Sequence, residues 1–571
     1  MKSLRIFVLL IILLIGYNGL KAKEKSKKGF VEYSYLENGK IDQKSSKTIL
    51  HYANGIAKSW VDKSNLDLID EVPKQYTYFD YSQNKIYQQA IFMSGDTCFT
   101  AFDFRIMEGF QPEGETEMIL GYACQKYVGS SFSNKIELWV TEDIGIKGTP
   151  LNYFPYQNGF VLKYVRNGNS GWEATKINFS NKVEDQLLYT HQLGDSVSDV
   201  EFRKKLTNAF IKDVQVFSNE QINWGDEIRN PEGIVNDSLY RFAGGSIIAK
   251  KVLLPAVPDG TSLFAEVTER SNGDAYDRTG SVFVIPQNKE KSFLDGLRFG
   301  KDALPKYFSE GNEYQGVVST KDYDPLIELM RFFTPFGVGH FNEKRNVGFE
   351  WSDSVVYKQD VTHLLPVLQK ECWIGVFIGN YDGGGHKVSL NLKYHLNSQE
   401  KPKKSPKRYW VQPVFNTTNV MEMAGQQYGT MFKNDTLTVN FNVPKGVKNI
   451  EFYYISTGHG GWGNGDEFVQ KQNSLFIDGK SFFNYTPWRY DCGTYRKFNP
   501  ASGNFWNGMS SSDYSRSGWC PGSVSHPYYT TVNDLQEGNH VIQVYIPIGE
   551  PEGNMFSAWN ISGLFIGSYE E

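Results

Sequence analysis

A strong excess of charge of one sign is missing from this 571-residue sequence. Its 59 Lys and Arg residues are matched by 64 Asp and Glu residues, which gives a net charge of -5. Because proteins that bind nucleic acid usually present a basic face, this balance argues against a polyanionic partner. It does not exclude a sugar, which is neutral and is recognised by aromatic faces and hydrogen bonds.

Closely spaced metal ligands are also missing. The sequence has no CxxC and no HxxxH spacing, so nothing in it indicates a zinc site. Neither a Ser/His/Asp spacing nor a nucleophilic Cys stands out. We therefore expect neither a catalytic metal nor a cofactor.

Cysteine is scarce, with five residues in the whole chain. Cys98 and Cys124 lie in one N-terminal region, Cys492 and Cys520 lie in one C-terminal region, and Cys372 stands alone in an apolar stretch. The simplest arrangement is two local disulfides, Cys98–Cys124 and Cys492–Cys520, with one buried thiol. Such bridges fit an oxidising compartment.

Long hydrophobic runs are absent except near the N-terminus. Lys2 and Arg5 precede an unbroken apolar run from Ile6 to Ile15. This run is shorter than the roughly 20 residues that a membrane span needs, so residues 1–22 are interpreted as a cleaved export signal rather than an anchor. We expect an exported protein, periplasmic in a bacterium or secreted, with no integral membrane segment after cleavage.

Glycine and aromatic residues are plentiful. The 54 Gly, 22 Pro, 34 Tyr and 39 Phe residues favour many strands joined by tight turns over long helices. The segment from Tyr323 to Met330 is one candidate for a short helix. The length predicts three domains of about 150–200 residues each.

Changes in the length and spacing of the strand-like runs divide the chain into these domains. Residues 23–205 form a β-rich N-terminal domain, residues 206–397 carry longer alternating runs, and residues 398–571 form a third domain. The basic stretch EKPKKSPKR from Glu400 to Arg408 is interpreted as a linker. The predicted fold class is all-β, with two sandwich-like domains after the N-terminal one.

The densest pattern is TGHGGWGNGDEF, from Thr457 to Phe468. Its glycines permit tight loop geometry and close approach of a ligand to the backbone. The nearby segments PWRYDCG, NPASGNFWNG and SRSGWCPG add Trp and Arg, as a sugar-binding cleft requires. Simpler accounts exist: Glu467 as a solvated loop carboxylate, Trp519 packed on a disulfide, and His459 in a loop hydrogen bond.

These motifs, with NGDAYDRTGSVFV (Asn272–Val284) and RFFTPFGVG (Arg331–Gly339) in the same order, resemble the peptide-N-glycosidase F family. The resemblance covers roughly residues 210–571. It implies two adjacent eight-stranded antiparallel jelly rolls with the active site at their interface. Longer members of that family carry an additional N-terminal domain.

The resemblance also implies a reaction and a set of site residues. The reaction is hydrolysis of the amide between asparagine and the innermost N-acetylglucosamine of N-glycosylated proteins or glycopeptides, by a water that a carboxylate activates. The residues implied are Asp277 as the base and Glu467 as a second catalytic carboxylate, with Arg278, His459, Trp462, Arg516 and Trp519 binding substrate. Without the resemblance, Asp277 and Arg278 would be interpreted as a local ion pair.

One departure from the family pattern concerns a further glutamate late in the first jelly roll. The matching stretch here reads FIGNYDGGG, with glycine or a neighbour in place of the carboxylate and Tyr381 in place of a tryptophan. Asp382 and Glu422 are candidates to replace the acid, and Glu422 is preferred because it can reach the cleft from across the interface. The alternatives are a non-catalytic glycan-binding protein and a two-carboxylate endoglycosidase.

Overall fold

The computed structural model describes residues 28–569 except 54, 65, 105–108, 145, 150–158, 179–192, 226, 338–350, 369, 398, 400, 402–407, 433–434, 462–464, 504 and 552. The export signal predicted at residues 1–22 lies outside the described residues. Among the described residues, no helix is both long and apolar enough to cross a membrane. Strands dominate, so the all-β prediction is confirmed.

The chain divides into two compact units. The first ends at Phe210 and also takes in Gln399–Lys401, and the second holds the remainder from Ile211 onward. Helix α2 (Asp199–Asn208) therefore runs through the boundary predicted between residues 205 and 206. Within the first unit, Gln399 and Lys401 are held by backbone hydrogen bonds to Ile69 and Asp67.

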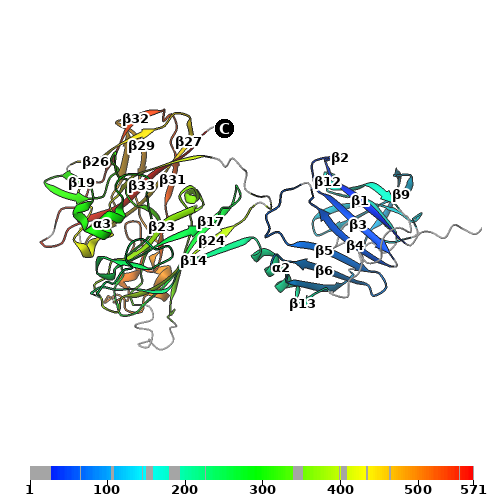
Figure 1. Cartoon of the computed structure of the whole chain (residues 1–571), viewed down its shortest axis with the longest axis horizontal. Helices are drawn as coiled ribbons and strands as arrows, with labels where there is room; N and C mark the ends of the chain where they lie inside the picture. The colour runs from blue at the N-terminus through cyan, green and yellow to red at the C-terminus, as the bar shows by residue number, and fades with distance from the viewer. Residues whose placement is uncertain are drawn as a thin grey trace, which may run out of the picture. The chain divides into compact units, whose positions relative to one another are not determined.

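The first unit is built on one thirteen-stranded sheet, whose strands β3, β4, β5 and β6 are seen side by side in Figure 1. Its neighbours pair antiparallel except β13 and β7. In spatial order the strands are β13 (Asp195–Ser196), β7 (Thr97–Asp103), β6 (Lys85–Ile91), β5 (Lys74–Asp80), β4 (Ile56–Asp62), β3 (Lys47–Ala53), β1 (Lys28–Glu37), β12 (Ser170–Asn178), β11 (Phe160–Arg166), β10 (Asn134–Thr141), β9 (Tyr122–Ser131) and β8 (Gln111–Ile119), with β2 (Lys40–Ile41) beside β1.

The predicted disulfide between Cys98 and Cys124 is wrong. Both residues are buried free thiols. Cys98, on β7, packs with Ala90 and with Phe202 of helix α2, whereas Cys124, on β9, belongs to the main core of the sheet. Strands β7 and β9 lie near opposite ends of the strand order, so closeness in sequence does not bring these two residues together. Cys372 is also a buried free thiol, as predicted.

The second unit begins with two antiparallel sheets that face each other across an apolar core. Helix α3 (Phe293–Phe299) packs its Phe293 and Leu297 against Phe283 and Trp373. One sheet contains β14 (Ile211–Ile222), β24 (His386–His395), β17 (Ser262–Ser271) and β22 (Val355–Asp360); the other contains β15 (Tyr240–Phe242), β16 (Ile247–Leu254), β23 (Lys370–Ile378), β18 (Thr279–Ile285), β21 (Ile327–Phe333) and β30 (Val524–Ser525).

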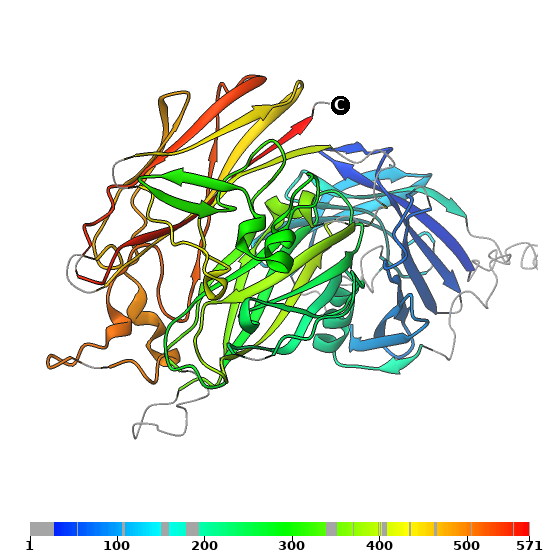
Figure 2. The same ribbon diagram turned by 60° about the vertical axis from the view of Figure 1, so that its left-hand side comes forward.

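The second jelly roll follows with two four-stranded sheets. One contains β25 (Tyr409–Asn416), β33 (Ala558–Tyr569), β27 (Val447–His459) and β31 (Tyr528–Thr531); the other contains β26 (Leu437–Val443), β32 (Gly538–Tyr545), β28 (Asn473–Ile477) and β29 (Lys480–Tyr485). Its strands (yellow to red) and those of the first jelly roll (green) lie in one unit in Figure 2. Strand β30, from the second domain's chain, pairs with β21 of the first.

The short helix predicted from Tyr323 to Met330 is wrong, because this segment leads into strand β21. Every residue of β21 is buried. Leu329 and Met330 pack in the core of the first jelly roll, while β21 also contacts β25 and β33 of the second. A strand buried on both faces reads as a continuous apolar run, which periodicity alone does not distinguish from a helix.

A buried ion pair on β21 joins the two jelly rolls. Arg331 and Glu328 are both fully buried, and Arg331 Nε donates to Glu328 Oε1 at 3.1 Å. The guanidinium also donates to Thr457 Oγ1 at 3.1 Å and to Thr418 Oγ1 at 2.8 Å, both in the second jelly roll. A buried charge is tolerated only when it is paired and hydrogen-bonded, so this network fixes the two domains against each other.

Candidate functional site

Asp277 and Arg278 lie in the loop between strands β17 and β18, at the edge of the first jelly roll. Arg278 pairs with Asp274 instead of its neighbour: its Nε and Nη2 donate to the two Asp274 oxygens at 2.7 and 3.1 Å. The backbone N–H of Arg278 donates to Thr334 Oγ1 at 2.8 Å. Asp277 is therefore left to make its ion pair elsewhere.

Two further buried charges hold Asp274 in place. His386, at the start of β24, lies 2.8 Å from Glu269 and 3.6 Å from Asp274. The carboxylates of Asp274 and Glu269 beside the ring outweigh the lowering effect of burial and raise the pKa of His386 to about 9. The pKa of Asp274 is well below its usual range because His386 and Arg278 both stabilise the carboxylate. Two positive and two negative groups thus form a neutral buried set beneath the loop.

Arg516 links Asp277 to Glu467 by forming an ion pair with each carboxylate. Arg516 Nη1 lies 3.3 Å from Asp277 Oδ2 and also contacts Glu467 Oε1, so one guanidinium bridges a carboxylate from each jelly roll. Glu467 lies in the loop after β27, where its carbonyl accepts from the N–H of Ser517 at 2.9 Å. Arg516 is only 3 % exposed, and its Nε has no hydrogen-bond partner among the described residues.

The two carboxylates are electrostatically strained. Burial raises the pKa of Glu467 to about 8, against the opposing effect of Arg516 and with a further increase from Asp277. Burial also raises the pKa of Asp277, and Arg516 again opposes the increase. Because a single cation serves two acids, the arrangement favours retention of one proton at neutral pH. This is the state from which one carboxyl donates a proton while the other accepts one.

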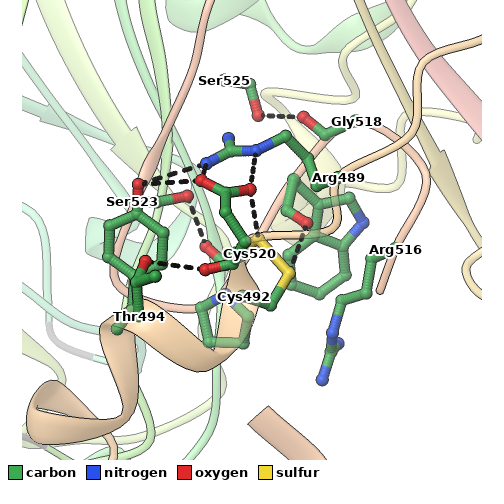
Figure 3. The surroundings of a disulfide bond; sticks show 12 residues. Arg489, Cys492, Thr494, Arg516, Gly518, Cys520, Ser523 and Ser525 are labelled. Atoms are coloured by element: carbon green, nitrogen blue, oxygen red, sulfur yellow. Dashed lines mark hydrogen bonds and ion pairs between the residues drawn. A yellow bond between two sulfur atoms is a disulfide. The ribbon is translucent and has the colours of Figure 1, made fainter. Parts of the chain in front are cut away.

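The Cys492–Cys520 disulfide, as predicted, pins the segment that carries Arg516. Figure 3 shows Arg489 and Arg516 beside this bridge, and their backbones pair through two hydrogen bonds. The Arg489 side chain in turn forms an ion pair with Asp491 at 2.7 Å. The bridge and the backbone pair together hold Arg516 at the base of the site.

His459 and Trp519 form an aromatic stack behind Arg516. Trp519 lies 4.2 Å from the Phe333 ring and 5.6 Å from the His459 ring, and Arg516 lies 4.5 Å above the Trp519 ring. Trp519 is 4 % exposed, so it packs against the arginine rather than facing solvent. Burial and the nearby arginines lower the pKa of His459 to about 3, so this ring is neutral at physiological pH.

Glu422 reaches the site from the second jelly roll. Its Oε1 accepts hydrogen bonds from the hydroxyls of Tyr381 and Tyr428. A Cβ placed on Gly379 would lie 3.0 Å from Glu422 Oε2. The Glu422 carboxylate therefore occupies the space that a side chain at position 379 would need.

These groups surround a cavity of about 190 Å³ between the two jelly rolls. Its walls include Asn419 and Asn560, whose buried Nδ2 and Oδ1 atoms have no hydrogen-bond partner among the described residues. Polar groups left free beside a cavity are available to a ligand. Of the residues predicted from the sequence, the cavity is lined by Asp277, Arg278, Tyr381, Glu422 and His459.

The other predicted residues have different places. Glu467 and Arg516 adjoin the cavity through their contacts with Asp277, Trp519 lies behind them, and Trp462 lies outside the described residues. Asp382 accepts hydrogen bonds from its own loop, at Gly384 and Gly385. Within the described part of the chain, no group of three or more His, Cys, Asp or Glu side chains is arranged to hold a metal.

Five residues of the site were not predicted from the sequence. They are Asp274, His386, Asn419, Tyr428 and Asn560. Asp274 had a usable signal, because it lies three residues before Asp277 in the same motif. His386 directly follows the FIGNYDGGG stretch, and Asn419 and Tyr428 flank Glu422, but no spacing of residue types marks them, and Asn560 lies far from every motif.

Models of three related domains match most of the chain. "Peptide-N-glycosidase F, N terminal" matches residues 213–394, and "Peptide-N-glycosidase F, C terminal" matches residues 427–566. "N-glycanase peptide, N-terminal domain" matches residues 31–204. No curated protein matches the chain.

Solved structures match over a similar length. PNGF-II in space group P21 is 42% identical, with a TM-score of 0.78 over 95% of this chain and 100% of that chain. PNGF-II in space group C2 is 43% identical, with a TM-score of 0.72 over 95% and 98%. PNGase F of Flavobacterium meningosepticum, described as a glycosylasparaginase, is 16% identical over 63% and 96%, with a TM-score of 0.42. The chain therefore belongs to the peptide-N-glycosidase F family, in the form that carries an additional N-terminal domain.

Proposed function

We propose that this protein hydrolyses the side-chain amide that joins asparagine to the innermost N-acetylglucosamine of N-glycosylated proteins and glycopeptides. Membership of the family supports a glycan-related amidase in general. The observation that carries the specific reaction is the Arg516 bridge between Asp277 and Glu467, which sets two carboxylates from different jelly rolls beside one cavity. No metal or nucleophilic side chain enters the proposal.

The reaction follows from the protonation states at this bridge. Asp277 accepts a proton from a water, whose oxygen attacks the carbonyl carbon of the asparagine side chain. N–H donors in the cavity wall, such as the unpartnered Asn419 Nδ2, stabilise the negative charge that develops on the carbonyl oxygen. The carbon–nitrogen bond breaks as Glu467, whose pKa of about 8 leaves it protonated at neutral pH, gives its proton to the departing nitrogen. The products are aspartate and a glycosylamine.

We assign Glu422 to the place of the glutamate that is missing from FIGNYDGGG. Two tyrosine hydroxyls bind Oε1 of its carboxylate, and Oε2 lies over Gly379. Both Glu422 and Gly379 line the cavity. Glu422→Gln keeps the size of the side chain and removes its charge. We expect a fall of about 10²-fold or more in kcat/KM on a glycopeptide, as is usual for loss of one electrostatic group. Full activity of this variant, with Asp382→Asn inactive, would assign the role to Asp382.

The first experiment uses a synthetic glycopeptide with one glycosylated asparagine and weighs the peptide product by mass spectrometry. Hydrolysis of the side-chain amide leaves aspartate, so the peptide is about one mass unit heavier than its asparagine form. We expect this product from the unaltered chain and a loss of about 10³-fold or more in Asp277→Asn. Asp259→Asn, on the loop before β17, is the matched control.

Two other results have definite meanings. A peptide that keeps its innermost N-acetylglucosamine would identify a two-carboxylate endoglycosidase. A glycopeptide that is bound but unchanged would identify a non-catalytic glycan-binding protein on the same scaffold. Either result would overturn the amidase.

We also propose that the protein is exported by its first 22 residues. The apolar run at Ile6–Ile15 and the Cys492–Cys520 disulfide support this, since such bridges persist in oxidising compartments. N-terminal sequencing of protein recovered outside the cytoplasm is expected to begin near Lys23. A chain that still begins at Met1 would contradict cleavage.

A further inference from the structure

A row of uncharged polar side chains crosses the sheet of the N-terminal unit. Ser59, Thr77, Gln88 and Thr100 lie directly opposite one another on the adjacent strands β4, β5, β6 and β7. Because paired residues point to the same face of a sheet, the four side chains form one continuous band. Neighbouring positions of that face, such as Ala57 and Ile86, belong to the apolar core.

Two cavities open along this band. The first, of about 710 Å³, lies between the sheet and the segment Lys63–Lys74. The second, of about 650 Å³, lies between the sheet and helix α2. Gln75, Tyr76 and Thr77 line both cavities, so the two adjoin at strand β5. Each has the size of a site for a small organic ligand, and together they form a groove across four strands.

The polar band has no partner of its own. Among the described residues, no hydrogen bond is formed by the side chains of Ser59, Thr77, Gln88 or Thr100. Two of these residues are nevertheless almost covered, with Ser59 6 % and Thr100 3 % exposed. All four residues line the two cavities, so their donors and acceptors are available to a molecule in the groove.

The rest of the lining narrows the chemistry of that molecule. Trp172 lines the first cavity and Phe102 lines the second, which supplies aromatic surface on both sides of the band, whereas the rings of Trp60 and Tyr76 pack together on the opposite face of the sheet. Charges of both signs occur at the margins, and Arg203 is already paired with Asp199 at 3.0 Å. Such a lining has no net attraction for an anion or a cation. Hydroxyl and amide groups beside aromatic rings suit a neutral, hydroxyl-rich ligand.

We propose that this groove is a second glycan site, which binds a neutral oligosaccharide through the polar band formed by the side chains of Ser59, Thr77, Gln88 and Thr100. It lies in the N-terminal unit and is separate from the cavity that contains Asp277. The groove would bind the sugar chain and not the asparagine–sugar amide, so binding there does not depend on the hydrolysis proposed above.

The test measures where a free oligosaccharide binds to the full chain. The probe is a branched mannose oligosaccharide with no peptide, and the readout is hydrogen–deuterium exchange of backbone amides with and without it. We expect slower exchange in peptides that cover residues 59–77 and 86–102. No protection there, or protection confined to the jelly rolls, would overturn the proposal. A chain that fails to hydrolyse glycopeptides would still give this pattern, so the two proposals fail separately.

Matched variants assign the binding to the polar band. The double variant Thr77→Val, Gln88→Leu keeps the shape of both side chains and removes their hydrogen-bonding groups. Loss of two hydrogen bonds to the ligand is expected to raise its Kd about tenfold or more. The control makes the same changes at Thr116 and Gln111, which are exposed on β8 of the same sheet. Equal affinity in the band variant and the control, with both folded by circular dichroism, would also overturn the proposal.

Discussion

Polar side chains are buried in two regions of this protein, and the two regions treat them differently. Between the jelly rolls, Arg331 and Glu328 bond to each other and to hydroxyls from both domains, such as Ser281 of the first and Thr457 of the second. In the N-terminal sheet, the band from Ser59 to Thr100 faces cavities and has no partner in the described part of the chain. A satisfied network fixes geometry, whereas an unsatisfied band is free to bind a ligand. The first arrangement stabilises the fold, and the second is the kind expected of a binding site.

The largest effect is expected from breaking the interface network with Arg331→Met. The change leaves Glu328 as a buried, unpaired carboxylate, so we expect a loss of about 3–5 kcal/mol in the free energy of unfolding of the jelly-roll unit. Denaturant unfolding followed by tryptophan fluorescence measures it. Arg229→Met is the control, because Arg229 and its partner Glu227 are 83 % and 78 % exposed. The control is expected to lose less than about 1 kcal/mol.

The charged set beneath Arg278 gives the next largest effect, and it depends on pH. The pKa of His386 is raised from 6.5 to about 9 in the folded state. Stability from this group is therefore fully present below pH 6.5, falls between pH 6.5 and 9, and is lost above that. The full change is about 3 kcal/mol by the usual relation between pKa and free energy. Unfolding measured across this window checks it, and Glu269→Gln is expected to flatten the slope.

Activity is also expected to depend on pH, through Glu467. Its pKa of about 8 keeps it protonated at neutral pH, and the proposed mechanism uses that proton. We expect kcat to fall above pH 8 by about tenfold for each further pH unit. Rates on a glycopeptide between pH 6 and pH 10 measure this. A rate that rises through this range would assign proton donation to another group.

The sequence predicted those parts of the molecule that depend on local pattern. Alternation and turn residues indicated strands, and the resemblance of the Gly-rich loop and of the AYDR motif led to Glu467 and Asp277. The pairing of Asp277 was not predictable, because sequence proximity favoured Arg278 while folding brings Arg516 from 239 residues away. His386 is missed for the same reason, since 117 residues separate it from Glu269. Such pairs arise from strand order, which local spacing does not contain.

The positions of the cysteines in the sequence led to one wrong disulfide, for a related reason. Cys492–Cys520 and Cys98–Cys124 have similar separations in sequence, yet only the first pair is bridged. The first pair lies outside the strands, at the start of a 3-10 helix and in a loop that fold back on each other, whereas the second pair lies on strands whose positions the sheet dictates. Sequence separation is thus informative between loops and uninformative within a sheet. Alkylation without reduction is expected to label three thiols in the unfolded chain.

The smallest expected effect tests the comparison most sharply, because it makes one chemical change in both regions. Thr77→Val removes a hydroxyl without a protein partner, so the free energy of unfolding should change by less than about 0.5 kcal/mol. Thr457→Val removes a hydroxyl that bonds to Arg331 at 3.1 Å and to His459 at 2.9 Å, and is expected to cost about 1–3 kcal/mol. Both are measured by denaturant unfolding of the full chain without ligand. Equal losses would mean that the band at Thr77 stabilises the fold as the interface does, and the distinction between the two regions would fail.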